Sequence, residues 1–430
     1  MNIMIIPIFI CLFGFLAYRK WSSILLGPAM ALLLVIVCRL PMVDTMLGPY
    51  LEASASFVQS NFFVFFLGAI FGGIMEATGA AQSIALWMSK LTRGKFVLPL
   101  IMTITGILTY GGVSGFVVYF AMYPIALYLC KEANISRALI PGAIASGCWA
   151  WSMTMPGSPS IPNVVATIFL GTAATADLIP GFLIAGLLQY LMVFGYLEYQ
   201  KVKYGRNGQT FVVDELVKQE MQHGMNKNLP HPLLAFLPLV LIVVLFNVVG
   251  FQIELALLIG VITGIIIFWK HTDGPSKWLH ICNKGANNSA AVILNTAMVV
   301  GFAGVIKQTE AFAALVEWLS GLSISPLVYV AFTAALCTGA AASSSGGLGI
   351  ALEAFKDAYM SLGIAPEIIH RVAVIAGGTL DSLPHSGGQI TLLNICHQTH
   401  KDAYIHMFIT ECVIPAITVA VLIVYHMILG

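Results

Sequence analysis

The chain is a succession of apolar runs, each about as long as a helix that crosses a lipid bilayer. Such a helix needs about 20 mostly apolar residues, and short polar or glycine-containing segments separate runs of that length. The pattern predicts an all-α polytopic membrane protein. Spanning helices are expected near residues 3–18, 22–39, 57–80, 137–170, 178–200, 231–250, 252–269, 287–306, 366–397 and 403–428.

Two further apolar runs, 97–130 and 324–361, are too long for one span and are interrupted near their middle. The interruptions read GGVSG at 111–115 and ASSSGG at 342–347. Glycine permits a tight turn and the close approach of a ligand, so each run predicts a re-entrant hairpin of two half-length helices. Irregular backbone at membrane depth is tolerated only where it is buried in protein or lines a water-filled cavity. Both tips are therefore expected inside the protein.

A polar segment at 201–230 divides the chain and is predicted to be a cytoplasmic linker. The two flanking halves, 1–200 and 231–430, each contain three spans, a hairpin, a long broken span and a last span. Short cytoplasmic loops hold most of the lysine and arginine of a membrane protein. Threading the chain from an external N-terminus places most of its 20 basic residues inside and leaves outside only Arg39, Lys307, Lys356 and Arg371.

In this orientation the two halves begin on opposite sides of the membrane. They are then inverted-topology repeats, an arrangement of many secondary transporters whose substrate sites lie at the repeat interface. The same threading predicts that both termini are external, in a bacterial cytoplasmic (inner) membrane.

Composition agrees with a membrane protein and excludes other classes. Hydrophobic residues make up 59% of the chain and charged residues 9%, against roughly 45–50% and 25% in soluble domains. The net charge of +1 provides no field for binding nucleic acid. The eight cysteines are scattered without metal-ligand spacing, so neither a metal site nor a cofactor is predicted.

Each of the two longest spans is broken by proline and glycine. The breaks read MPGSPSIPN at 155–163 and DSLPHSGGQ at 381–389, and each releases backbone groups and begins a new half-helix near Asn163 or Gln389. With the two hairpin tips, four half-helix N-termini would converge. Each favours an anion by about 0.3–1 kcal/mol, and by up to about 2 when partly buried. Together they approach the several kcal/mol needed to desolvate one carboxylate, so a small carboxylate can bind without a central arginine or lysine.

Serine and glycine at the tips and breaks are the candidate ligand contacts, because hydroxyls donate and accept hydrogen bonds. Close packing of small residues between helices is the alternative explanation. Asp381 and His385 are candidates for the coupling proton, since intramembrane ionisable groups are functional candidates by default, although hydrogen bonding to a broken backbone also explains them. The candidate substrate-binding residues are Gly112, Ser114, Gly115, Gly157, Ser158, Ser343, Ser344, Ser345, Gly346, His385, Ser386 and Gly387.

Two stretches of the second half carry a resemblance to a known family. SSSGGLGIALEAF at 343–355 and GGTLDSLPHSGGQITLLNICHQTHKDAY at 377–404 resemble the signature region of the gluconate permease family, which includes gluconate and 3-hydroxybutyrate permeases within the larger ion transporter superfamily. The resemblance implies a proton symporter of small hydroxycarboxylates. It also implies a homodimer in which a hairpin-bearing transport domain moves as an elevator against a scaffold. By position, the substrate-proximal residues would be Ser344, Ser345, Gly346, His385, Ser386 and Gly387.

Three alternatives remain open. Sodium coupling, known in related families, is less favoured because neither tip carries a Ser-Asn-Thr motif. An anion channel on the same repeats would carry flux that ignores a proton gradient. An intramembrane enzyme using Asp381, His385 and Ser386 is disfavoured, because nothing orders a nucleophile, a base and an orienting group. The chain is therefore predicted not to be an enzyme.

Overall fold

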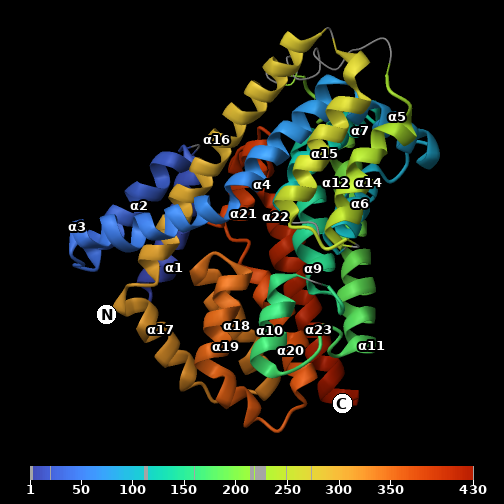
Figure 1. The fold of residues 1–430 in the computed structure, drawn as a ribbon. Helices are drawn as coiled ribbons and strands as arrows, with labels where there is room; N and C mark the ends of the chain where they lie inside the picture. Colours follow the sequence, from blue (N-terminus) through green and yellow to red (C-terminus); the bar gives the residue numbers. More distant parts are fainter. Residues whose placement is uncertain are drawn as a thin grey trace.

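The computed structural model describes residues 3–19, 21–110, 115–158, 160–213, 217, 229–247, 249–272 and 274–429, and these contain helices and no strand (Figure 1). The predicted all-α polytopic class is confirmed. Among the described residues, four continuous helical segments are long and apolar enough to cross a membrane: Met42–Ala77, Leu178–Arg206, Pro275–Ile306 and His400–Leu429.

The first half of the chain forms helices that are joined in places by short π-helical segments. Their bounds are α1 (Ile5–Tyr18), α2 (Ser23–Val37), α3 (Met42–Thr45), α4 (Leu51–Ala77), α5 (Ala80–Thr92), α6 (Val97–Tyr110), α7 (Gly115–Glu132), α8 (Ile140–Ala145), α9 (Ser152–Thr154), α10 (Ile161–Leu170), α11 (Leu178–Gly181) and α12 (Gln189–Arg206).

The second half contains a similar series. Its bounds are α14 (Pro232–Asn247), α15 (Ile253–Ile267), α16 (Pro275–Ile306), α17 (Glu310–Ser320), α18 (Pro326–Ala341), α19 (Ser344–Met360), α20 (Pro366–Leu380), α21 (Gly387–Ile395), α22 (Ile405–Phe408) and α23 (Ile414–Leu429), with the π-helical segment η7 (Ile409–Val413) between the last two.

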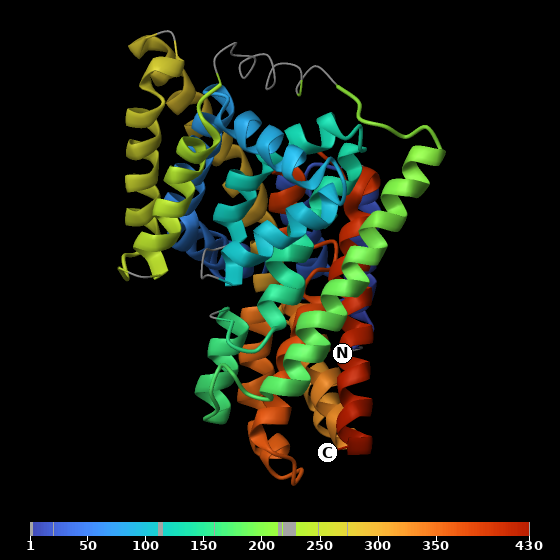
Figure 2. The same cartoon turned by 90° about the vertical axis from the view of Figure 1, so that its right-hand side faces the viewer.

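The long helices α4 and α16 lie side by side along much of their length (Figure 1). Glycines on α16 allow the close approach. A Cβ on Gly285 would lie 2.8 Å from the Cα of Ile70, and one on Gly301 would collide with Ser54 and Tyr50. Small residues at such contacts let membrane helices pack closely. The α16 helix also packs on α2, while α14 and α15 stand at the edge of the molecule (Figure 2).

Helices α18 and α19 form an antiparallel pair that turns at Ala342 and Ser343. Ala342 has a φ of 52°, and the hydroxyl of Ser343 accepts a hydrogen bond from the backbone N–H of Gly346 at 3.2 Å, which caps α19. A Cβ on Gly347 would collide with the backbone of Thr338, so glycine is needed where the two helices leave the turn. Helices α6 and α7 flank the other predicted tip, whose residues 111–114 lie outside the described residues.

Both predicted helix breaks are present. The first separates α9 from α10, and the second separates α20 from α21. Gly157 in the first break has a φ of 81°, and its N–H donates to the carbonyl of Ala174 at 2.9 Å. The hairpin α18–α19 packs on α20 and α10, which brings one hairpin tip beside both breaks. The inverted-repeat relation between the halves stays a prediction.

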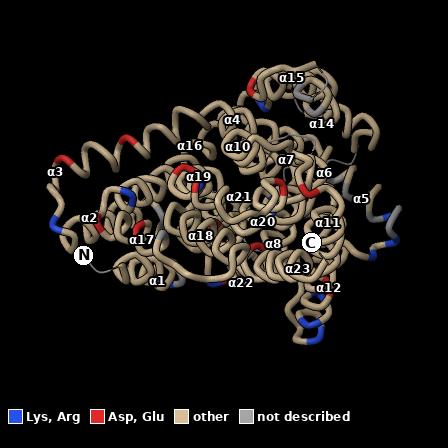
Figure 3. The backbone as a smooth tube through the Cα atoms, turned by 90° about the horizontal axis from the view of Figure 1, so that it is seen from below, with Lys and Arg blue, Asp and Glu red and all other residues tan. Residues whose placement is uncertain are grey.

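Lysine and arginine lie mostly at the periphery when the molecule is seen from below (Figure 3), whereas several acidic residues lie nearer the middle. Figure 3 shows lysine and arginine gathered at the ends of α5 and α12 and near α2. Arg371, which the threading places on the external side, is fully buried on α20. Its guanidinium donates to the carbonyls of Thr154, Ala174 and Ala176 and to the Oδ1 of Asn163, at distances from 2.6 to 3.2 Å.

Candidate functional site

A cavity of about 420 Å³ lies where the α18–α19 tip meets both helix breaks. Its volume falls in the range of small-molecule sites. The tip contributes 342–345, the first break Ser158 and 160–162, and the second break 381, 382, 386, 388 and 389. Other walls come from Asn61, Thr109, Gly115, Phe116, Cys148, Trp149, Ser152, Met153 and Ile253.

Serines occupy the N-cap positions of three helices that begin at this cavity. Ser160 precedes α10, Ser343 precedes α19 and Ser386 precedes α21, and all three line the cavity. Ser160 and Ser386 make no capping hydrogen bond to their own helix. The first N–H groups of a helix have no partner inside it, so those of α21 are available to a ligand. In the first turn of α10 only Ile161 and Asn163 have an N–H to donate, because the second residue is Pro162. A fourth helix, α7, begins at Gly115 on the same wall.

The second break presents two buried carboxyl groups that share one hydroxyl. The hydroxyl of Ser382 lies 3.1 Å from Oδ1 of Asp381 and 3.3 Å from Oε2 of Glu411. The amide of Gln389 donates to the same Oε2 of Glu411, and Ser344 at the hairpin tip interacts with Asp381. Asp381 and Gln389 line the cavity, while Glu411 lies directly behind them with no exposed surface.

Glu411 is the main residue that the sequence analysis missed. It lies in the apolar run predicted to span at 403–428, within the π-helical segment η7. The rule that singled out Asp381, that ionisable groups inside a span are functional candidates, applies equally to Glu411. Its partners Ser382 and Gln389 are distant in sequence, so only the fold could show the cluster.

The predicted site residues divide into two groups. Gly115, Ser158, Ser343, Ser344, Ser345, Ser386 and Asp381 line the cavity, whereas Gly157, Gly346, Gly387 and His385 do not. The glycines of the second group have positions that explain them locally: Gly157 forms a left-handed turn, Gly346 donates its N–H to the capping hydroxyl of Ser343, and a Cβ on Gly387 would lie 3.0 Å from Thr296 on α16. Gly112 and Ser114 lie outside the described residues.

His385 is fully buried beside the second break rather than on the cavity wall. Its Nε2 lies 3.0 Å from the carbonyl of Gly339 on α18, and because a carbonyl only accepts, that nitrogen carries a proton and donates. The ring packs edge-on against Phe13 and Phe302. In this position His385 ties the break to the hairpin helix α18.

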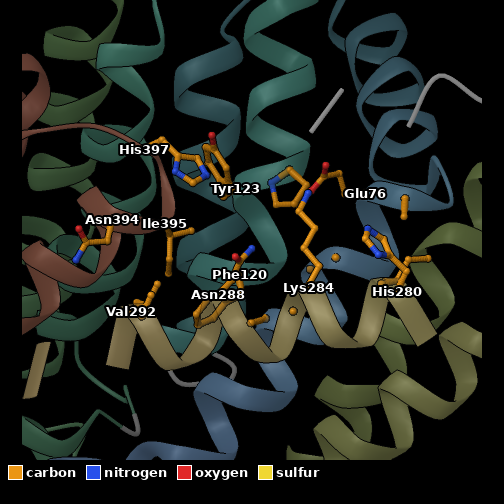
Figure 4. Close-up of a pocket in the computed structure, with 18 of the residues that line it drawn as sticks. Glu76, Phe120, Tyr123, His280, Lys284, Asn288, Val292, Asn394, Ile395 and His397 are labelled. Carbon is orange, nitrogen blue, oxygen red and sulfur yellow. The ribbon is translucent and has the colours of Figure 1, made fainter. Parts of the chain in front are cut away.

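A second cavity, of about 290 Å³, lies at the other end of α21. Asn394 and Ile395 near the end of α21 line it, together with residues of α4, α7 and α16. In Figure 4, His280, Lys284 and Asn288 project from α16 toward the side on which Glu76, Tyr123 and His397 lie. Along α21, Thr391 lies between the residues that line the two cavities, and its hydroxyl is 2.6 Å from the hydroxyl of Thr296 on α16.

The chain is similar to uncharacterized transporters and permeases, and to one of them over nearly its whole length. It is 32% identical to the uncharacterized transporter YxjC of Bacillus subtilis, in an alignment of 482 positions that covers 99% of each chain. The chain belongs to the transporter family that includes YxjC. No protein-family model matches the chain.

Two proteins of Haemophilus influenzae are also similar to this chain. An uncharacterized permease is 25% identical over 293 residues, covering 61% of this chain and 58% of its own. An uncharacterized transporter is 27% identical over 339 residues, covering 75% of this chain and 76% of its own. The names of these relatives and the apolar helices of the fold together indicate a multi-pass membrane transporter.

Proposed function

We propose that the protein is a secondary active transporter that carries a small hydroxycarboxylate, such as gluconate or 3-hydroxybutyrate, together with a proton. The proposal includes membership of the gluconate permease family, a homodimer, an elevator movement of the hairpin-bearing helices, and a location in the bacterial inner membrane with both termini external. These parts rest on the resemblance and on the distribution of lysine and arginine in the sequence.

One observation carries the proposal: three helix N-termini with a serine at the N-cap position and the start of α7 meet at one cavity. A helix N-terminus attracts an anion through its unpaired N–H groups and its dipole. Arg371 is engaged with carbonyl oxygens, and the ammonium of Lys307 lies beside Gly346 behind the hairpin tip; neither residue lines the cavity. Helix N-termini are therefore the cavity groups that we assign to the substrate carboxylate.

The hydroxyl groups of the cavity favour a substrate that itself carries hydroxyls. Ser158 and Ser345 line the walls beside the N-cap serines. A hydroxyl can donate to one partner and accept from another, so these side chains can satisfy substrate hydroxyls in either role, whereas the hydroxyls of Thr109 and Ser152 on the same wall bond to each other at 2.8 Å. Phe116 and Trp149 supply apolar surface against a short carbon chain.

Uptake of labelled gluconate and 3-hydroxybutyrate into proteoliposomes tests the function. An inward proton gradient is imposed in one set of vesicles and an inward sodium gradient in another. We expect accumulation of one of the two compounds above its external concentration with the proton gradient alone. Accumulation with sodium alone would overturn proton coupling, equilibration without accumulation would indicate a channel, and no flux of either compound would refute the substrate class.

Matched variants connect the function to the cavity. Ser345→Ala and Ser386→Ala each remove a cavity hydroxyl, and we expect each to raise KM for uptake several-fold. Ser361→Ala removes an exposed hydroxyl at the far end of α19 and is expected to match the wild type. Unchanged uptake kinetics in both cavity variants would refute the site.

A further inference from the structure

The carboxyl groups of Asp381 and Glu411 lie in surroundings that disfavour two negative charges. Glu411 has no exposed surface and Asp381 is 7% exposed. Within the described residues neither forms an ion pair with a basic side chain. Asp381 also caps the C-terminal end of α20, where the helix dipole repels a negative charge. Two unpaired carboxylates so deeply buried would each carry a large desolvation cost.

The hydroxyl of Ser382 indicates how this cost is avoided. It lies within hydrogen-bonding distance of both carboxyl groups, yet it has one hydrogen and can donate to only one of them. Both contacts become hydrogen bonds when one carboxyl is protonated and donates to the oxygen of Ser382. The geometry therefore fits a pair that shares a single proton.

Gln389 can serve Glu411 in either protonation state. Its amide nitrogen donates to Oε2 of Glu411, as suits an ionised carboxylate. The amide oxygen of Gln389 (Oε1) and the second carboxyl oxygen of Glu411 (Oε1) are buried and have no hydrogen-bond partner among the described residues. If Glu411 takes up a proton, a half-turn of the amide places Oε1 of Gln389 as the acceptor. Glutamine can therefore hydrogen-bond Glu411 in both protonation states, whereas a lysine would favour only the ionised carboxylate.

The other titratable groups around Glu411 are weak acids. Tyr119 and Cys148 face it from α7 and the first broken span, and Tyr404 and Cys412 from its own span. The hydroxyl of Tyr404 donates to the carbonyl of Ser382 at 2.9 Å. None of these neighbours carries a positive charge, so Asp381 and Glu411 are the groups that exchange a proton here.

We propose that the coupling proton is held between Glu411 and Asp381, with Ser382 and Gln389 as its hydrogen-bond partners. The inference rests on the proposed function and deepens it. Gln389 lies in the first turn of α21, and both it and Asp381 line the cavity. A substrate carboxylate arriving there meets strong repulsion unless the pair holds a proton. Binding of the anion and of the proton then favour each other reciprocally, which is the requirement for symport.

The test uses the variant Glu411→Gln and measures two processes separately: exchange of substrate across the membrane and accumulation driven by a proton gradient. An uncharged side chain at this position mimics the protonated state, so exchange of labelled for unlabelled substrate across the vesicle membrane should continue. Accumulation driven by a proton gradient should be lost, with the internal concentration reaching only the external one. Glu353→Gln, on the exposed surface of α19, is the matched control and should accumulate substrate like the wild type.

Accumulation by Glu411→Gln at the wild-type level would overturn the inference and leave the proposed function intact. Failure of the wild type to accumulate either substrate would instead refute the proposed function. If Glu411→Gln loses exchange as well, the variant Gln389→Met tests the inference. In that variant the ionised Glu411 lacks the amide donor of Gln389, so the pH of half-maximal uptake should move to a higher value. An unchanged pH profile would overturn the inference.

Discussion

Replacing Arg371 by methionine tests how the first break is held in place. The guanidinium donates to the backbone carbonyls of Thr154, Ala174 and Ala176 and to Oδ1 of Asn163. Thr154 precedes α10 in the sequence, Asn163 lies in its first turn, and Ala174 and Ala176 follow it. The N-terminus of α10 borders the cavity. Arg371 thus fastens the helix that carries Ser160 to the helix that precedes the second break.

The expected cost follows from the acceptors that lose their donor. In Arg371→Met the buried carbonyls of Thr154 and Ala176 lose their donor, whereas the carbonyl of Ala174 keeps the N–H of Gly157 at 2.9 Å and Asn163 keeps its contact with Nε2 of His370 at 3.2 Å. An unsatisfied buried polar group costs about 1–3 kcal/mol. At the lower end, two carbonyls give about 2 kcal/mol, because removing the buried charge returns part of the loss. For a protein of this size, that corresponds to a fall in Tm of about 2 °C.

Thermal unfolding of the detergent-solubilised protein measures this shift, and proteoliposome uptake measures its effect on the site. We expect Arg371→Met to lower Tm and raise KM, and Arg371→Lys to recover only part of both, since lysine cannot reach four acceptors with a planar fork. Arg206→Met, at the exposed end of α12, should match the wild type. A Tm for Arg371→Met equal to that of the wild type would refute the proposed fastening role.

Three further substitutions test the turn, the cavity and the histidine. Gly347→Ala should impair folding and uptake, because its Cβ would collide with Thr338, whereas Gly349→Ala meets nothing within 4 Å and should be neutral; equal yields of folded protein would contradict this. Gly115→Ala should displace the ring of Trp149, which lines the cavity, and raise KM; unchanged kinetics would contradict this. His385→Phe should keep proton-driven accumulation while lowering Tm, and loss of accumulation in stable protein would return His385 to the coupling role.

Local features of the fold were predictable because their signals are local. Proline and glycine locate both breaks, and the serine and glycine run at 342–347 locates the turn between α18 and α19. Helix extent was less accessible. The start of α16, 275–286, contains lysine, histidine and asparagine and reads as a loop, yet it continues the helix along α4.

The site could be predicted only in part, because side chains distant in sequence complete it. The serines of the tip and breaks were found, since several hydroxyls in a predicted membrane interior are unusual. The proton pair was half found: Asp381 lies in a break, but Glu411 lies in an unbroken apolar run, and its pairing through Ser382 and Gln389 depends on packing. The role of Arg371 could not be predicted, because its carbonyl partners lie in the first half of the chain and are brought to it only by the fold.

The most direct test of the account is where the substrate carboxylate binds. A cryo-electron microscopy structure would be determined with whichever of gluconate and 3-hydroxybutyrate the vesicles accumulate. We predict density in the cavity between Ser343 and Ser386, with the carboxylate within hydrogen-bonding distance of the first N–H groups of α19 and α21. A carboxylate bound in the second cavity, beside Lys284 and His280 on α16, with the first cavity empty, would contradict the account.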